Sequence, residues 1–364
     1  MPIFIPYFLC LFALALLTAA NRRCCPMEKK ATYDFWLSFV LPFVLLCLFS
    51  CFRHLVGGNI DEYAYRNRWL HFSQIGLGEA LALSHEREFL FALISWSSAH
   101  LFETSQGIII CTAFLTLGGM LWSFRKYSLD FQYAVLLFLA MGILWNTFNG
   151  IQQSLATAFL LVFADKIAER NLPALIMITL CCMTIHQSAL FFLYFYFIAK
   201  YKTNSWSTII FIILLTTSVM LFAYKSVSML AGYLNSLEQY ANYNELERPG
   251  VNAVTILISF APIALIGMFG KKIAASDPVT RFAACLCCVD AGIMLASSVD
   301  TYIARFAMYT TPFVVIFLSR INQFFKKGNE YALFKLVSLG LYGIVVFLRM
   351  RGTDYYWGIY GIGE

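Results

Sequence analysis

Arginine side chains and one histidine are the groups in this sequence best suited to chemistry. The chain has 364 residues, of which 60% are hydrophobic and only 13% charged, so a charged group away from a short turn is costly to keep. A guanidinium group grips phosphate or carboxylate through two parallel hydrogen bonds, and imidazole exchanges a proton near neutral pH. These residue types predict handling of an anionic ligand.

The first polar segment runs from Arg53 through two glycines to an acidic and aromatic stretch. Carboxylate, guanidinium and phenol groups at this spacing could bind sugar hydroxyls and a phosphate group. The alternative is an ordinary solvated loop beside a membrane span. The candidate residues here are Arg53, Asp61, Tyr63, Tyr65 and Arg66.

The second segment, residues 146–154, places six amide or hydroxyl side chains and a glycine between two apolar runs. Such groups offer donors and acceptors to a hydroxyl-rich ligand without burying a charge. A plain turn needs Asn and Gly, but not the paired Gln that opens the next helix. Asn149, Gln152 and Gln153 are therefore candidates for sugar binding.

Two further segments carry ionisable groups. His186 stands in a polar tripeptide within strongly apolar sequence, where it could be a general base, a donor to a leaving phosphate or a satisfied core histidine. Asp300, Tyr302 and Arg305 follow another apolar run. Asp300 and Arg305 could bind substrate or neutralise each other as a structural pair.

Apolar runs long enough to cross a bilayer must position these groups, which predicts one all-α integral membrane domain over residues 1–364. We expect about 10 to 12 spans, with re-entrant or interfacial helices and an outward-facing cavity. The segment 172–198 is expected to form a hairpin of two half-helices with His186 near its tip. The expected spans lie near 3–20, 35–51, 107–123, 129–148, 153–168, 205–224, 251–269, 279–298, 302–319 and 331–348.

Lysines predict the orientation. They gather in loops that can all be cytoplasmic if the N-terminus is outside, as the positive-inside rule favours. The outer loops then carry many arginines and Lys225 as the one clear lysine, unless some spans are misassigned. The outer arginines would be Arg53, Arg66, Arg68, Arg87, Arg248, Arg305, Arg349 and Arg351.

Several classes of function are excluded or disfavoured. The basic residues form no contiguous tract, so the net charge of +6 does not indicate nucleic-acid binding. There is no P-loop and no paired CxxC motif, and most cysteines lie in apolar runs as small hydrophobes. We expect no nucleotide, no metal and no other cofactor.

Five motifs follow one another along the chain. They are the loop with Arg53, Gly57, Asp61 and Tyr65, the acidic helix start from Glu86 to Trp96, Gln-Ser-Leu-Ala at 153–156, His-x-Ser-Ala-Leu at 186–190 and Arg-Phe-x-x-Tyr at 305–309. Their order resembles the EpsG family of bacterial exopolysaccharide and O-antigen polymerases, the Wzy-type proteins, over roughly residues 50–310. One departure is Gln152-Gln153, where the family often has Arg-Gln.

The resemblance implies a GT-C-like helical bundle in the bacterial plasma membrane, with its active site facing the periplasm or exterior. Its substrate would be a polyprenyl-pyrophosphate-linked oligosaccharide, and a flippase and a chain-length regulator would be partners beside membrane lipids. We expect His186 or Asp61 to activate the acceptor hydroxyl, with Arg305 also catalytic and Arg53 and Arg66 holding pyrophosphate.

Two other classes remain open on sequence. A membrane O-acyltransferase that modifies surface polysaccharide would also use a histidine within the membrane and outer arginines, but no comparable polar cluster faces the cytoplasm, from where the acyl donor would come. A lipid-linked oligosaccharide flippase would also bind an anionic lipid. It would be expected to carry charge along a central cavity, whereas the polar residues here gather toward one face.

Overall fold

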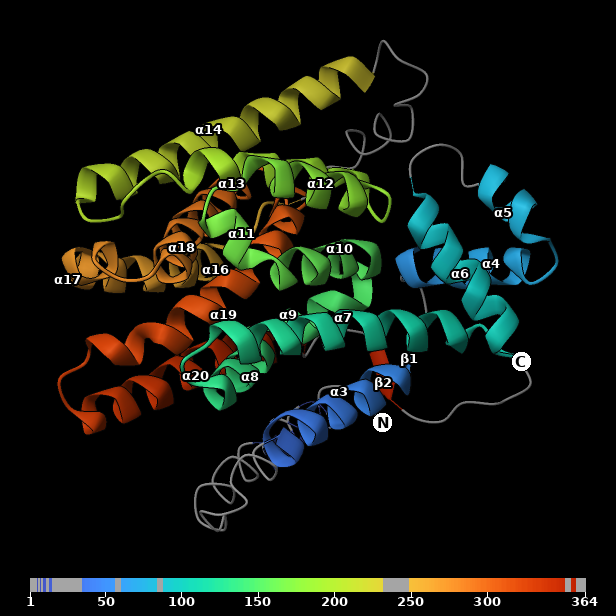
Figure 1. The fold of residues 1–364 in the computed structure, drawn as a ribbon, viewed down its shortest axis with the longest axis horizontal. Helices are drawn as coiled ribbons and strands as arrows, with labels where there is room; N and C mark the ends of the chain where they lie inside the picture. Colours follow the sequence, from blue (N-terminus) through green and yellow to red (C-terminus); the bar gives the residue numbers. More distant parts are fainter. Residues whose placement is uncertain are drawn as a thin grey trace. The chain divides into compact units, whose positions relative to one another are not determined.

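The structure is a computed structural model that describes residues 5, 7, 9, 10, 13, 14, 35–55, 60–83, 88–231, 249–350 and 355–357. Most of these residues are helical, which confirms the expected all-α bundle (Figure 1). By its internal contacts the chain forms two compact units. Unit 1 comprises residues 1–167, 171–193 and 319–364, and unit 2 comprises 168–170 and 194–318.

Unit 1 contains the helices on which most of the predicted polar segments lie. Its elements are η2 (Trp36–Val40), α3 (Leu41–Cys51), β1 (Arg53–Leu55), α4 (Ile60–Phe72), α5 (Leu77–Leu83), α6 (Phe89–Leu101), α7 (Gln106–Tyr127), α8 (Phe131–Ala140), α9 (Ile143–Asn149), α10 (Ile151–Val162), most of α11 (Ala164–Ala168), α12 (Leu172–Met183), η3 (Gln187–Phe191), the start of α13 (Phe192–Ile198), η6 (Ile321–Phe324), α20 (Gly328–Met350) and β2 (Tyr355–Trp357).

Helix α7 is central to unit 1, where it packs against α3, α6 and α10 (Figure 1). Small residues allow the approach of α10, since a Cβ added at Gly119 would lie 3.1 Å from the Cβ of Ala158. A further glycine separates α8 from α9. Gly142 has a left-handed φ of 72°, and a Cβ there would lie 2.6 Å from Val346 in α20. Both the backbone conformation and the lack of space therefore disfavour a side chain at this position.

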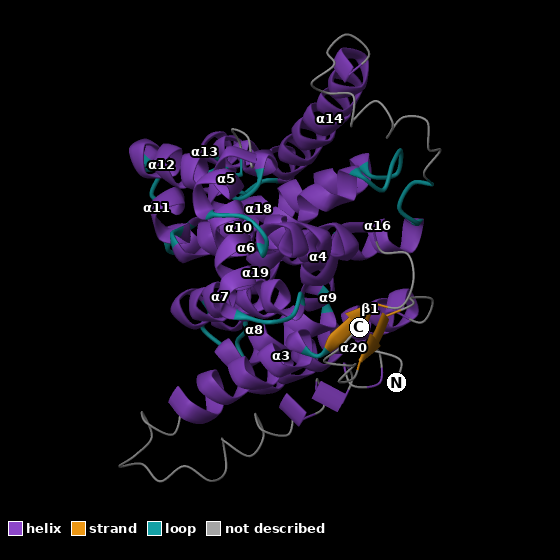
Figure 2. Cartoon of the chain, turned by 90° about the vertical axis from the view of Figure 1, so that its right-hand side faces the viewer, coloured by secondary structure: helices purple, strands orange, loops and turns teal. Residues whose placement is uncertain are grey.

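A short antiparallel ladder is the one feature of the described chain that departs from the expected helices (Figure 2). Strand β1 pairs with β2, with Arg53 opposite Trp357 and Leu55 opposite Tyr355. The sequence gives little sign of it, because three residues are too few for an alternating pattern. The ladder joins backbone segments that lie far apart along unit 1.

Unit 2 is organised around α18 (Pro278–Ala296), whose residues are mostly buried. Helix α18 packs against four neighbouring elements and approaches α14 closely at Gly292, where a Cβ would lie 2.7 Å from Thr216. The elements of unit 2 are the end of α13, α14 (Trp206–Ala231), α16 (Ala253–Ser259), α17 (Ala261–Ala274), α18, η5 (Ile303–Tyr309) and most of α19 (Thr311–Arg320).

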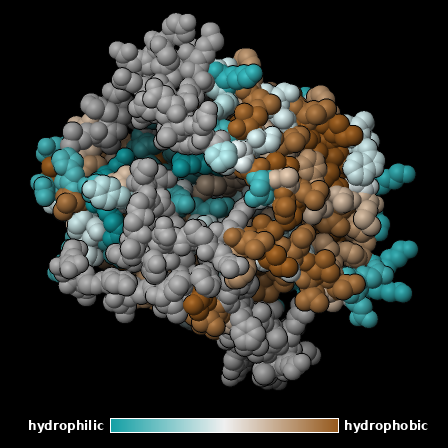
Figure 3. Space-filling view, turned by 180° about the vertical axis from the view of Figure 1, so that it is seen from behind, coloured by the Kyte–Doolittle hydropathy of each residue, from teal (hydrophilic) through white to brown (hydrophobic). Residues whose placement is uncertain are grey.

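Five helical stretches in the described chain are long and apolar enough to cross a membrane, and the bent pair α8–α9 makes a sixth if it forms one span. Many large hydrophobic side chains on these helices are exposed, and Figure 3 shows extensive hydrophobic surface on the face in view. Such surface is unfavourable in water and suited to lipid. The five stretches are 106–127, 206–226, 253–274, 278–296 and 328–348.

The remaining expected spans are shorter or interrupted, so reaching the expected 10 to 12 requires shorter apolar helices to cross as well. The span expected near 153–168 ends as α10 at Val162, and the one near 302–319 begins as the 3-10 segment η5. The break expected around His186 is confirmed: α12 ends at Met183 and η3 begins at Gln187. The span near 3–20 lies mainly outside the described residues.

Candidate functional site

Three chain breaks meet in unit 1 and bring polar side chains together. Glu88 immediately precedes α6, Gln152 lies in the first turn of α10, and His186 lies in extended backbone between α12 and η3. The carbonyl of Thr184 accepts hydrogen bonds from the backbone N–H groups of Leu90 at 3.0 Å and Phe91 at 3.3 Å. These bonds hold the end of α12 against the start of α6.

Gln152 is the buried connector of this cluster. Its Nε2 donates to Glu88 Oε2 at 2.6 Å and to the carbonyl of Ile185 at 3.2 Å, while its Oε1 accepts from the Tyr65 hydroxyl at 3.2 Å. The amide thus uses both its donor and its acceptor capacity to join three segments. Tyr65 is held further by an edge-to-face contact with Phe91.

Glu88 faces two basic side chains at longer range. Its Oε1 lies 3.6 Å from His186 Nδ1, and its Oε2 lies 3.7 Å from Arg68 Nη1. Both separations exceed a hydrogen bond, so these are electrostatic contacts. The Arg68 guanidinium also lies over the Phe91 ring, 5.4 Å from its centre. We name Glu88, Gln152, His186, Tyr65 and Arg68 the Glu88 cluster.

The electrostatics of the cluster favour an ionised carboxylate. Burial acts to raise the pKa of Glu88, but the neighbouring His186, the Gln152 amide and the charge of Arg68 outweigh it, so the pKa lies below its ordinary value. The side chains keep partial access to their surroundings, with exposed fractions of 22% for Glu88 and 31% for His186. His186 Nδ1 is buried and has no hydrogen-bond partner within the part of the chain that the structure describes.

The predicted residues near Arg53 lie in different surroundings. Arg66 donates to Ser105 Oγ at 3.0 Å and Gln106 Oε1 at 2.7 Å, which links α4 to the start of α7. Tyr63 is 67% exposed. The side chains of Arg53 and Asp61 lie outside the described residues, although the Arg53 backbone pairs in β1.

The predicted amides also separate. Gln152 enters the Glu88 cluster, whereas the neighbouring Gln153 is buried in α10 and its carbonyl accepts from Thr157 at 2.7 Å. Asn149 ends α9 and is half-buried. Adjacent residues of a helix point about 100° apart, so only one of the two glutamines can face Glu88.

The last group of predicted residues lies in unit 2. Asp300 is buried, and its carboxylate accepts from the Tyr224 hydroxyl at 2.8 Å and from the backbone N–H of Tyr302 at 2.6 Å. The Arg305 guanidinium lies over the Tyr302 ring, 5.1 Å from its centre, and Arg305 is exposed. These residues form a second polar region, around η5.

Sequence reasoning did not select Glu88 or Arg68 as site residues. Glu88 lies within the acidic helix start from Glu86 to Trp96 and Arg68 is one of the expected outer arginines, but their partners lie on other segments. Gln152 is 64 residues from Glu88 along the chain. The available signal was a carboxylate at the polar end of an apolar helix, where a charge needs a partner.

No ready-made metal site is found in the described ranges, where no three His, Cys, Asp or Glu side chains gather as ligands. The polar groups that do gather are one carboxylate, one imidazole, an amide, a phenol and a guanidinium. Such a set can bind hydroxyl groups and exchange a proton.

Comparisons with known proteins agree with the membrane character and the resemblance. No curated protein and no solved structure matches the chain. A family model described as the EpsG family matches residues 36–359, beyond both limits of the motif-based estimate. With its long apolar helices, this match identifies a multi-pass membrane protein. Because the match covers nearly the whole sequence, the chain belongs to the EpsG family.

Proposed function

We propose that this protein is a polysaccharide polymerase that joins polyprenyl-pyrophosphate-linked oligosaccharide units on the outer face of the bacterial plasma membrane. Membership of the EpsG family supplies the class, a glycosyltransferase-like polymerase. The observation that carries the finer proposal is the Glu88–His186 pair, 3.6 Å apart and joined through Gln152 to Tyr65. Ionisable groups gathered at helix breaks in an apolar protein are typical of a substrate site.

In the proposed reaction, a hydroxyl oxygen of the acceptor sugar attacks the anomeric carbon of the donor. The new glycosidic C–O bond forms as the bond from that carbon to the phosphate oxygen breaks, and the lipid pyrophosphate leaves with the bonding electrons. His186 takes the hydroxyl proton. Since its Nδ1 faces Glu88, its Nε2 is the nitrogen we assign to the acceptor.

Glu88 supports this step by charge. An ionised carboxylate beside the imidazole stabilises the imidazolium formed when the proton is transferred. Gln152 and Tyr65 fix the orientation of that carboxylate and offer polar edges to a sugar. Asp61 remains the alternative base, and Tyr63, Asn149 and Gln153 remain proposed sugar contacts.

Arginines are proposed to hold the leaving group. A pyrophosphate gains charge as the bond to the sugar breaks, and fixed guanidinium groups stabilise it without a nucleotide. Arg305 is exposed on η5, and Arg66 donates to Ser105 and Gln106. Arg53, Arg66 and Arg305 remain, each by itself, proposed pyrophosphate contacts.

Deleting the gene in its host and restoring it with variants tests this function. Surface glycans and lipid-linked oligosaccharides would be separated on gels and weighed by mass spectrometry. We expect the deletion to leave single repeat units and no long polymer, and His186→Ala not to restore the polymer. His100→Ala is the matched control, because His100 stacks on Trp96 in the same unit and should restore full length.

The other classes give different results in the same experiment. Full-length polymer that lacks only an acyl mass would identify an acyltransferase. Repeat units trapped at the cytoplasmic face would identify a flippase. Each of these outcomes, or unchanged glycans, would overturn the proposal.

A further inference from the structure

Unit 2 holds the short 3-10 segment η5 between two buried carboxylates. Asp300 precedes η5 and is 5% exposed, and Asp290 lies in the apolar helix α18 and is 6% exposed. The sequence suggests Asp300 as a possible substrate contact, and the reaction proposed above uses neither carboxylate. A buried carboxylate is costly in an apolar helix, so its contacts are informative.

Asp300 anchors the start of the segment. Its Oδ2 accepts from the hydroxyl of Tyr224 in α14 at 2.8 Å, and its Oδ1 accepts from the Tyr302 backbone at 2.6 Å. Tyr302 directly precedes η5, and its ring lies under the Arg305 guanidinium. The carboxylate therefore links α14 to the residue that supports Arg305.

Asp290 anchors the other end through two hydroxyl groups. Its Oδ1 lies 2.6 Å from Thr310 Oγ1 and 3.0 Å from Thr311 Oγ1. The same hydroxyl oxygens lie 3.2 Å and 2.7 Å from the carbonyl of Ala307, within η5. Each hydroxyl has one hydrogen, so Thr310 favours Asp290, while the hydrogen of Thr311 is shared between Asp290 and η5.

We propose that Asp290 and Asp300 are positioning residues that fix η5 so that Arg305 meets the pyrophosphate of the lipid-linked substrate. The inference rests on the proposed function. Runs of 3-10 helix have poor hydrogen-bond geometry and seldom extend far, so η5 needs support from its surroundings. Arg305 is exposed, and holding its backbone removes part of the entropy that binding would otherwise cost.

The test measures binding of farnesyl pyrophosphate to the full chain in detergent micelles by isothermal titration calorimetry. This short isoprenyl pyrophosphate carries the chemistry that Arg305 is proposed to grip. We expect Asp290→Ala and the double variant Thr310→Val/Thr311→Val each to weaken binding about tenfold, as expected from loss of a hydrogen bond to a charged group. Asp290→Asn, which keeps an oxygen acceptor, should bind nearly as the wild type does.

Combination with Arg305→Ala separates positioning from general stabilisation. If Asp290 acts through Arg305, the double variant Arg305→Ala/Asp290→Ala binds no more weakly than Arg305→Ala alone. Asp277→Ala is the matched control, because Asp277 caps the start of α18, about 20 Å along the helix from Asp290. It should lower the unfolding temperature without changing the affinity.

The inference would be overturned if the losses of affinity caused by Arg305→Ala and by Asp290→Ala multiply in the double variant. It would also be overturned if Asp277→Ala lost as much affinity as Asp290→Ala. Wild-type affinity in Arg305→Ala would also overturn it, since there would be no contact to position. The polymerase function is judged separately, from glycans made in cells that carry His186→Ala. Failure of one proposal is thus distinguishable from failure of the other.

Discussion

Two kinds of carboxylate in unit 1 differ in how closely their basic partners approach. Asp165 lies 2.9 Å from Lys126 Nζ, and Asp130 lies 3.0 Å from Lys335 Nζ. Glu88 stands 3.6 Å from His186 and 3.7 Å from Arg68. The short pairs are closed hydrogen-bonded contacts, whereas the basic side chains around Glu88 retain capacity for a ligand.

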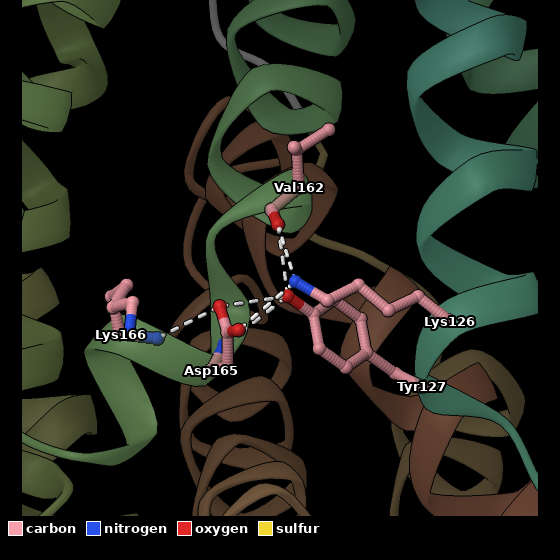
Figure 4. Close-up of polar contacts among 5 residues, drawn as sticks. All are labelled: Lys126, Tyr127, Val162, Asp165 and Lys166. Carbon is pink, nitrogen blue, oxygen red and sulfur yellow. Dashed lines mark hydrogen bonds and ion pairs between the residues drawn. The ribbon is translucent and has the colours of Figure 1, made fainter.

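Figure 4 shows one of the closed contacts in full. The Tyr127 hydroxyl lies between Asp165 Oδ1 at 2.9 Å and the carbonyl of Val162 at 2.8 Å, and the backbone of Lys166 donates to the same carboxylate. The carbonyl of Val162 belongs to the last turn of α10, where helical partners run out. These contacts around Asp165 therefore join α7 to the end of α10 and leave few polar groups available to a substrate.

Neutralising one carboxylate of each kind tests this difference most directly. We expect Glu88→Gln to reduce polymer synthesis about 100-fold, because an amide cannot stabilise the imidazolium of His186. Asp165→Asn should leave synthesis within about twofold of wild type, since exposed ion pairs contribute little. Initial rates in membranes with equal protein content would measure both, and similar losses would show that the two contacts are not different in kind.

A second prediction concerns the more buried closed pair. Lys335→Met should destabilise the protein by about 2 kcal/mol, because it leaves the partly buried Asp130 without its cation. Asp130→Asn/Lys335→Met should recover most of this loss, since asparagine still caps α8 in place of Asp130. Unfolding in mixed micelles measures the stability of both variants. If Lys335→Met were as stable as wild type, the Asp130–Lys335 pair would not contribute to stability.

The smallest expected effect is the pH dependence of the stability that Glu88 contributes. Its pKa is lowered in the folded protein, so its contribution to stability is present above the pKa of the unfolded chain and is lost as pH falls through the folded pKa. The difference in unfolding temperature between wild type and Glu88→Gln should therefore shrink on acidification. Removing the nearby charge in Arg68→Gln should raise the pKa of Glu88 and so move this loss of stability to higher pH. An unchanged pH midpoint of the loss would exclude an electrostatic contact between Arg68 and Glu88.

The sequence predicts the fold better than it predicts the site. Apolar runs identify the all-helical membrane class, because each span must satisfy its own backbone. The break at His186 is visible as polar residues in an apolar run, and Gln152 stands out for the same reason. Tyr65 belongs to the charged and aromatic segment that follows Arg53. Their partner Glu88 does not, because its role depends on contacts between α6, α10 and the end of α12 that lie far apart in sequence.

Local ambiguity explains the other differences. Gln152 and Gln153 are equivalent in composition, and only the rotation of α10 separates the member that meets Glu88 from the one that faces the core. Asp300 and Arg305 suggested an ion pair, yet the contacts that the structure describes for Asp300 are with Tyr224 and the Tyr302 backbone. A charge pattern names the residues that need partners but does not identify those partners.

The pairing of β1 with β2 has a consequence for synthesis of the chain. Leu55 pairs with Tyr355, so 355 − 55 = 300 residues must be translated before this ladder can close. At ribosomal rates, the first strand waits roughly 15 to 60 s for its partner. The ladder is therefore a late event in biogenesis, and a nascent chain stalled before residue 355 would carry an open edge available to chaperones or proteases.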